Sequence, residues 1–244
     1  MKYLILFIYF IYSLAISEEK LGTVEVIGIS PLPGILIEKN KHPSSSQSIN
    51  QNEIKKNLGK TLADIMNENL SGVTVKDVQN GSFQKNLDYR GFTASPLLGE
   101  SQGITVYLDG VRINESFGDT VQWELIPEYA IKKVDLMSSN PAFGLNALGG
   151  SISLTTKKGL DYKNEELYLN NTVKVGSYAY HSETFEFGTG TEDTGLYTSL
   201  EKASDGGWRD HSKGKISRFY SNIEHEKDSY NINFSILGGD TDLN

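Results

Sequence analysis

Cysteine is absent from the 244 residues of this chain, and proline occurs only six times. The lack of cysteine excludes disulfide bonds, thiolate zinc sites, iron–sulfur clusters and a cysteine nucleophile. Histidine is scarce too, and its four copies show neither metal-ligand spacing nor a serine–histidine–aspartate arrangement: His42, His181, His211 and His225. We therefore expect no metal site, no cofactor and no enzymatic activity.

Clusters of basic residues are also missing. The formal net charge is −8, and the lysines and arginines stand singly or in pairs along the chain. Nucleic-acid binding depends on clustered positive charge, so we expect no nucleic acid among the partners. What the chain does contain is 24 glycines, 13 tyrosines and 10 phenylalanines, a mixture that favours β-structure with many tight turns.

Only one long apolar run is present, and it lies at the N-terminus. Lys2 is followed by an almost unbroken apolar stretch, and Ala15-Ile16-Ser17 then precedes charged residues. This order is typical of a secretory signal peptide, so we assign residues 1–17 to a leader and expect export. The run is shorter than the roughly 20 residues of a spanning helix, and the alternative is an uncleaved anchor or a buried helix.

A short β-prone segment follows the leader. It ends at Gly28, and a turn-forming segment with two prolines at residues 31–34 interrupts it. Such a strand either packs on its own domain or adds to the sheet edge of another protein. We treat residues 18–40 as one segment and the serine-rich residues 42–52 as a linker or loop.

The following residues carry local helix and strand signals. Thr61 and Asp64 have the spacing of a capping box, and apolar residues at helical spacing follow until Gly72. This pattern predicts a short helix with one apolar face that packs on a core. Residues 73–75 are predicted to form a short strand.

A β-hairpin is predicted at residues 104–113, where two alternating segments flank an Asp109-Gly110 turn. A short helix is predicted from Pro127 through Ile131, and a strand at residues 134–137.

Three glycines lie close together near residue 147: Gly144, Gly149 and Gly150. A phosphate loop would need a helix after the glycines, whereas the alternating residues 151–155 predict a strand there. We therefore expect these glycines to serve close backbone packing.

Three segments in order resemble the plug domain of TonB-dependent outer-membrane receptors, and the resemblance covers residues 23–156. They are Asp88-Tyr89-Arg90-Gly91-Phe92, the hairpin strand and turn from Val106 to Val111, and the segment from Phe143 to Ile152. Each segment alone is a weak signal, whereas the ordered set is specific. The resemblance implies an α+β plug domain at residues 41–158, with a small mixed sheet and short helices.

The β-prone segment then contains a match to the TonB box, the stretch that such receptors offer to the periplasmic energy-transducing protein TonB. The matching residues are Thr23, Val24, Glu25 and Val26. The resemblance thus implies TonB as a partner and favours a free strand that adds to the TonB sheet.

The resemblance also implies a contact between plug and barrel at Arg90. In the family, plug arginines are thought to pair with barrel carboxylates, and Arg90 matches the first such position. Ser139-Asn140 stands ahead of Pro141 where many relatives have Arg-Gly, so the second arginine is missing and a charge lock would be thinner. The alternative is a solvated loop arginine.

Residues 164–244 alternate between apolar and polar side chains. The alternation is sharpest where Tyr230, Ile232, Phe234 and Ile236 oppose Asn231, Asn233 and Ser235. Membrane-barrel strands of about 10 residues alternate in this way, and so do strands of soluble β-sandwiches. The leader and the plug resemblance favour the barrel. Turns are predicted at residues 188–190 and 205–211, where Trp208 is a candidate for an interfacial aromatic girdle.

The predicted fold is therefore an α+β plug domain followed by antiparallel β-strands of an incomplete transmembrane β-barrel. Residues 164–244 have room for four or five strands, whereas the resemblance implies about 22, so we expect a truncated chain. The expected function is that of a receptor in the cell outer membrane, in contact with lipid, for energy-coupled uptake of a scarce nutrient such as a ferric siderophore, haem or cobalamin. The alternative is a secreted or periplasmic β-rich binding module that does not transport.

Overall fold

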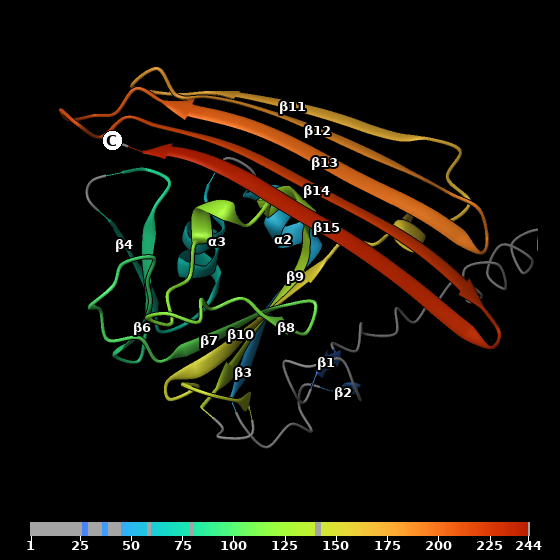
Figure 1. The fold of residues 1–244 in the computed structure, drawn as a ribbon, viewed down its shortest axis with the longest axis horizontal. Coiled ribbons are helices and arrows are strands. Elements are labelled where there is room, and N and C mark those ends of the chain that lie inside the picture. Colours follow the sequence, from blue (N-terminus) through green and yellow to red (C-terminus); the bar gives the residue numbers. More distant parts are fainter. Residues whose placement is uncertain are drawn as a thin grey trace, which may run out of the picture.

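A computed structural model describes residues 26–28, 36–38, 45–57, 60–78, 81–139 and 143–243. These residues include an α+β unit, defined here as residues 45–158, and a sheet of five long strands, β11 to β15 (Figure 1). Among them, no helix combines the length and the apolarity needed to cross a membrane. The predicted leader, residues 1–17, lies outside the described residues.

The α+β unit is built on a mixed five-stranded sheet. Its strand order is β3-β9-β10-β7-β8, and only the central β10–β7 pair is parallel. A parallel pair needs a long crossover, which the chain between β7 and β10 provides. The bounds are β3 (Ser46–Ile49), β7 (Ile104–Leu108), β8 (Val111–Arg112), β9 (Ile131–Ser138) and β10 (Gly150–Thr156). The mixed sheet of the predicted fold class is confirmed.

A smaller antiparallel sheet and several short helices complete the unit. The small sheet contains β4 (Val73–Asp77), β5 (Lys85–Tyr89) and β6 (Phe92–Ala94). The helices are α2 (Gln51–Lys56), α3 (Leu62–Asn69) and the 3-10 helices η2 (Trp123–Leu125), η3 (Glu128–Ala130) and η5 (Gly159–Tyr162). Helix η5 follows the unit directly and leads into β11.

The predicted capped helix is α3. The Thr61 side chain accepts a hydrogen bond from the backbone N–H of Asp64, and the Asp64 side chain accepts one from the backbone N–H of Thr61. Leu62, Ile65 and Met66 are buried on the apolar face of α3, where they join the main core with residues of β7, β9 and β10. Local capping and core burial thus agree at this helix.

The predicted Asp-Gly hairpin is also confirmed. Leu108 pairs with Val111, and the two turn residues between them have positive φ, 50° at Asp109 and 83° at Gly110. These values fit the two-residue turn that matches the twist of a hairpin.

The glycines near residue 147 serve close packing, as expected. A Cβ on Gly149 would lie 2.6 Å from the Phe92 ring, and a Cβ on Gly150 would lie 2.6 Å from the backbone oxygen of Met137. No larger residue fits these two positions without a shift of the neighbouring atoms.

The five long strands form an antiparallel sheet in chain order, β11-β12-β13-β14-β15. Figure 1 shows them side by side across one side of the α+β unit. Burial alternates along β12 and β13, so one face of this sheet is covered by the unit and the other is open. The bounds are β11 (Tyr168–Val175), β12 (His181–Gly190), β13 (Thr194–Asp205), β14 (Gly214–Lys227) and β15 (Tyr230–Leu243).

Three local predictions were wrong. The predicted linker contains strand β3, in which Ile49 is fully buried, because β9 offers it an edge to pair with. Ile131 belongs to β9 rather than to the preceding helix, since it pairs with Thr156. The predicted turn at residues 188–190 is the last part of β12, and the chain reverses at residues 191–193.

Candidate functional site

The face of the long-strand sheet that the α+β unit covers is called the inner face below. Its side chains come from alternate positions of β11–β14, and several of them are charged. Polar residues of this kind are costly to bury unless they are paired. The contacts between this face and the α+β unit comprise two ionic clusters, one hydrogen-bonded chain and one backbone contact.

The first cluster is centred on Arg218 of β14. Its guanidinium donates to Glu201 of β13 at 3.0 Å, to Glu128 of η3 at 3.0 Å and to the backbone oxygen of Ile126 at 2.6 Å. The Arg218 side chain is only 2% exposed. Lys174 of β11 interacts electrostatically with both glutamates, so the cluster contains two cations and two anions.

The second cluster is centred on Glu186 of β12. Lys157, at the end of the α+β unit, forms an ion pair with the Glu186 carboxylate. Tyr197 donates to the same carboxylate at 2.6 Å, and Asn170 donates to its other oxygen at 2.8 Å. Burial lowers the pKa of Lys157, and the negative charge of Glu186 opposes this shift. The ion pair with Glu186 therefore offsets part of the cost of burying the Lys157 ammonium inside the interface.

A hydrogen-bonded chain connects the hairpin turn of the α+β unit to β14. The Asp109 carboxylate accepts from the Thr156 hydroxyl at 2.6 Å and from Lys158 at 2.7 Å. The Thr156 hydroxyl in turn lies 2.6 Å from the hydroxyl of Tyr220 on the inner face. An ion pair and hydroxyl hydrogen bonds thus supplement the two buried ionic clusters.

Helix η5 touches the inner face with its backbone. The N–H of Gly159 donates to the Asn222 side chain at 2.6 Å. A Cβ on Gly159 would lie 2.0 Å from the backbone oxygen of Gly195, so the backbones of η5 and β13 meet without side chains between them. One helical turn on, Tyr162 stacks on Tyr197 with ring centroids 5.2 Å apart.

This arrangement suits a contact that holds two parts of one chain together. Both ionic clusters join the α+β unit to the inner face, and each is nearly closed to solvent. Removing one partner of such a buried pair costs about 3–5 kcal/mol because the other charge remains without compensation. Among the described residues, no group of histidine, aspartate and glutamate side chains could hold a metal ion.

The predicted contact residue Arg90 lies elsewhere. It occupies the turn between β5 and β6 with φ of 52°, it is exposed, and its guanidinium lies 5.0 Å from the centre of the Tyr89 ring. Its guanidinium also donates to the Ser138 hydroxyl at 3.4 Å. No carboxylate of the described residues pairs with it, so its contact with a barrel stays a prediction.

The predicted TonB-binding residues are only partly described. Thr23, Val24 and Glu25 lie outside the described residues. Val26 is the first residue of β1 (Val26–Gly28), which pairs antiparallel with β2 (Leu36–Glu38) in the register Val26 to Glu38. One edge of this strand is therefore occupied by the chain itself.

Sequence reasoning missed the interface residues, although a signal was present. Glu186, Glu201 and Arg218 are charged residues on the polar side of strands whose other side is apolar. That position indicates an inward side chain in a barrel strand. Their partners Glu128 and Lys157 have no comparable pattern, so the pairs could not be matched from the sequence.

Residues 38–151 match the family model of the TonB-dependent receptor plug domain. The rhizobactin receptor of Rhizobium meliloti is 32% identical over 130 residues, which are 52% of this chain and 16% of that protein. The relatives named here are receptors, not enzymes.

Solved receptors have the same fold. The pyoverdine outer-membrane receptor of Pseudomonas aeruginosa, bound to pyoverdine, has a TM-score of 0.62 at 16% identity, over 93% of this chain and 32% of its own. The ferric preacinetobactin receptor of Acinetobacter baumannii has a TM-score of 0.68 at 13% identity, over 88% and 30%. The chain thus spans less than a third of these relatives. The chain thus contains the plug domain of TonB-dependent receptors at residues 38–151, and together with the strands that follow it shares the fold of these outer-membrane receptors.

Proposed function

We propose that the receptor containing this chain takes up a ferric siderophore across the outer membrane, coupled to energy through TonB. The observation that carries the proposal is the plug seated on the inner face of barrel strands by the Arg218 and Glu186 clusters. A siderophore is preferred to haem or cobalamin because the rhizobactin, pyoverdine and preacinetobactin receptors are named for siderophores.

In the proposed mechanism, the siderophore binds on the outer side while the plug blocks the barrel lumen. TonB then pulls on the segment around Thr23, Val24, Glu25 and Val26 and displaces the plug. Strand addition supplies affinity mainly through main-chain hydrogen bonds and places little demand on side chains. Because β2 pairs with one edge of β1, TonB would use the remaining edge or displace β2.

The plug contact assigned to Arg90 belongs to the same proposal. Arg90 is exposed and lacks a carboxylate partner among the described residues, on a turn that β11–β15 do not cover. We place its partner on a part of the barrel wall outside β11–β15. A solvated arginine remains the alternative for this position.

A proline at position 24 tests the coupling segment. Proline lacks the N–H that strand addition requires, so Val24→Pro is expected to abolish uptake of the radiolabelled ferric siderophore while cells still bind it. Val24→Ala, which keeps the N–H, is the matched control and should transport like the natural protein. Normal uptake by the proline variant would reject the coupling segment.

Cellular location tests the same proposal independently. Ile232, Phe234 and Ile236 on the open face of β15 are 59%, 61% and 49% exposed, which water does not favour and hydrocarbon does. The receptor should fractionate with the outer membrane. Recovery of the protein in the soluble periplasmic fraction would instead support a binding module that does not transport.

A further inference from the structure

The open side of the long-strand sheet, here called the outer face, carries an apolar band. Its side chains come from the positions that alternate with those of the inner face, and Phe185 and Leu200 are among its exposed members. In an outer-membrane barrel such a band faces the hydrocarbon of the bilayer. Lipid is therefore the medium in contact with this face.

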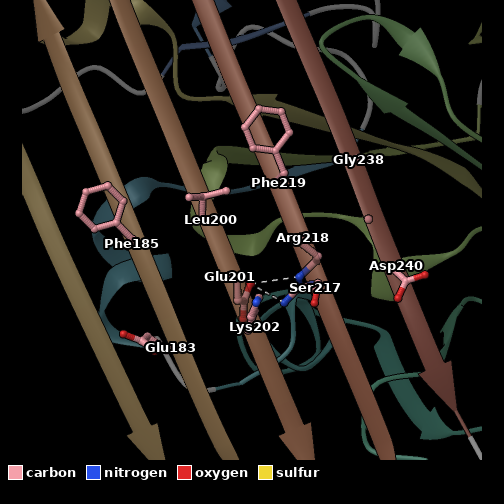
Figure 2. Close-up of a pocket in the computed structure, with 11 residues that line it drawn as sticks. Glu183, Phe185, Leu200, Glu201, Lys202, Ser217, Arg218, Phe219, Gly238 and Asp240 are labelled. Carbon is pink, nitrogen blue, oxygen red and sulfur yellow. Dashed lines mark hydrogen bonds and ion pairs between the residues drawn. The ribbon is translucent and has the colours of Figure 1, made fainter.

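A hollow of about 420 Å³ interrupts the outer face where β12 to β15 run side by side (Figure 2). Strand pairing places Phe185, Leu200, Phe219 and Gly238 in one row across the four strands. A Cβ on Gly238 would meet no atom within 4 Å. The glycine thus leaves the fourth position of an otherwise apolar row empty.

The hollow opens toward the membrane and not toward the plug. Glu201 and Arg218 also border it, but their side chains are 5% and 2% exposed and pair with each other on the inner face. Figure 2 shows this pair joined by dashed lines between the strands that carry Leu200 and Phe219. These two residues therefore contribute backbone to the hollow, and its side-chain walls belong to the outer face.

A charged row borders the hollow on one side. Glu183, Lys202, Ser217 and Asp240 are paired across the same four strands, two residues along from the apolar row. Lys202 is exposed, and no carboxylate of the described residues lies within ion-pair distance of it. On β12 to β15 the side chains thus change from apolar to charged at this row, as they do where hydrocarbon gives way to lipid headgroups.

We propose that this hollow is a binding site for a single phosphate-bearing membrane lipid. One acyl chain fills the space at Gly238 between Phe219 and the neighbouring strands, and the lipid phosphate pairs with Lys202. The two parts of the site match the two parts of such a lipid, since an apolar hollow adjoins a cation without a protein partner at the headgroup level. The hollow also has the size of a small-molecule site.

The site is independent of the proposed transport function. It needs the outer face to lie in lipid, but it requires neither a siderophore nor TonB. Loss of uptake in the Val24→Pro variant and loss of the lipid therefore report on separate claims.

Native mass spectrometry of the complete receptor, extracted from outer membranes in mild detergent, tests the proposal. The natural receptor should retain one lipid per molecule. Gly238→Leu fills the hollow with a side chain and should remove the lipid, whereas Asn171→Leu, in the same row outside the hollow, should retain it. Lys202→Gln should lower the retained fraction, and Lys215→Gln, on the outer face beyond the hollow, should not.

Two results would overturn the proposal. One is a natural receptor that carries no lipid, and the other is equal retention in the Gly238→Leu and Asn171→Leu proteins. If the Gly238→Leu protein does not assemble, Gly238→Ala should give a partial loss of lipid, because a methyl group occupies only part of the space. Unchanged retention in the Gly238→Ala protein would then count against the site.

Discussion

At the residue scale, Glu124 shows how burial and charge compete in this plug. Its side chain is 4% exposed, one carboxylate oxygen accepts from the Gln84 amide at 2.8 Å, and the other has no hydrogen-bond partner. Burial raises the pKa of Glu124, and the Gln84 hydrogen bond opposes this shift only in part. The ionised carboxylate is thus a source of instability in the folded plug.

A pH series on Glu124→Gln tests this conflict. A raised pKa means that the folded state binds the Glu124 proton more tightly than the unfolded state. Stability should therefore fall as pH rises from the ordinary value of 4.5 through the raised pKa in the natural protein. Glu124→Gln lacks this titration and should be more stable than the natural protein at pH 7.

Calorimetry of the complete receptor across this pH range gives the measurement. Glu100→Gln is a suitable control because Glu100 is an exposed carboxylate of the same unit that is not among the charges acting on Glu124. The advantage of Glu124→Gln should disappear at acidic pH. A variant that is less stable than the natural protein at pH 7 would show that the carboxylate is compensated there.

At the element scale, the crossing of η5 and β13 shows where backbone meets backbone. Gly159 and Gly195 approach so closely that a Cβ on Gly195 would lie 2.1 Å from the Gly159 backbone oxygen. Neither glycine has a positive φ. The contact therefore requires the small size of these two residues and not an unusual backbone conformation.

Gly195→Ala should therefore destabilise the packing of η5 against β13. Overpacking of this kind costs typically about 1–3 kcal/mol because backbone atoms must move. Gly238→Ala is the matched control in the same sheet, since a Cβ there would meet no atom within 4 Å. Thermal unfolding that is equal for the two variants would contradict the close contact.

Elements with local signals were predictable from the sequence, and those without were not. The α3 capping box and the hairpin turn at Asp109 depend on neighbours along the chain, so their residues could be recognised. Strand β3 has the composition of a linker and becomes a strand only because β9 lies beside it. A serine-rich segment at a sheet edge carries no pattern that distinguishes it from a loop.

At the scale of the whole molecule, the contact between the α+β unit and the inner face of the long-strand sheet depends on a few buried charges. Arg218 joins β13, β14 and η3, which lie far apart in the sequence. Arg218→Met should lower the free energy of unfolding by about 3–5 kcal/mol, because Glu128 and Glu201 would remain buried without the guanidinium that bonds to both. Differential scanning calorimetry of the complete receptor measures the loss.

Two further variants separate the effect of charge from the effect of packing at this contact. Lys215→Met, on the exposed outer face of the same strand, should change stability by no more than about 0.5 kcal/mol. The triple variant Arg218→Met, Glu128→Gln, Glu201→Gln should recover part of the loss, since no buried carboxylate is left without a cation and only the half-buried Lys174 loses its partners. If Arg218→Met has no more effect than Lys215→Met, the cluster does not hold the plug.

The sequence by itself determined the elements that carry their own local signals, such as α3 and the hairpin at Asp109, and it pointed to the plug domain. Alternation with a period of two shows which side chains of a strand share a face, and the ordered plug segments identify the domain, because both properties depend on neighbouring residues. Only the tertiary structure decided which charges meet, placing Arg218 against Glu128 and Lys157 against Glu186. Such pairs form only when the plug packs against the strands in one particular position. That position depends on contacts between segments that lie far apart in the sequence, so local sequence patterns do not reveal it.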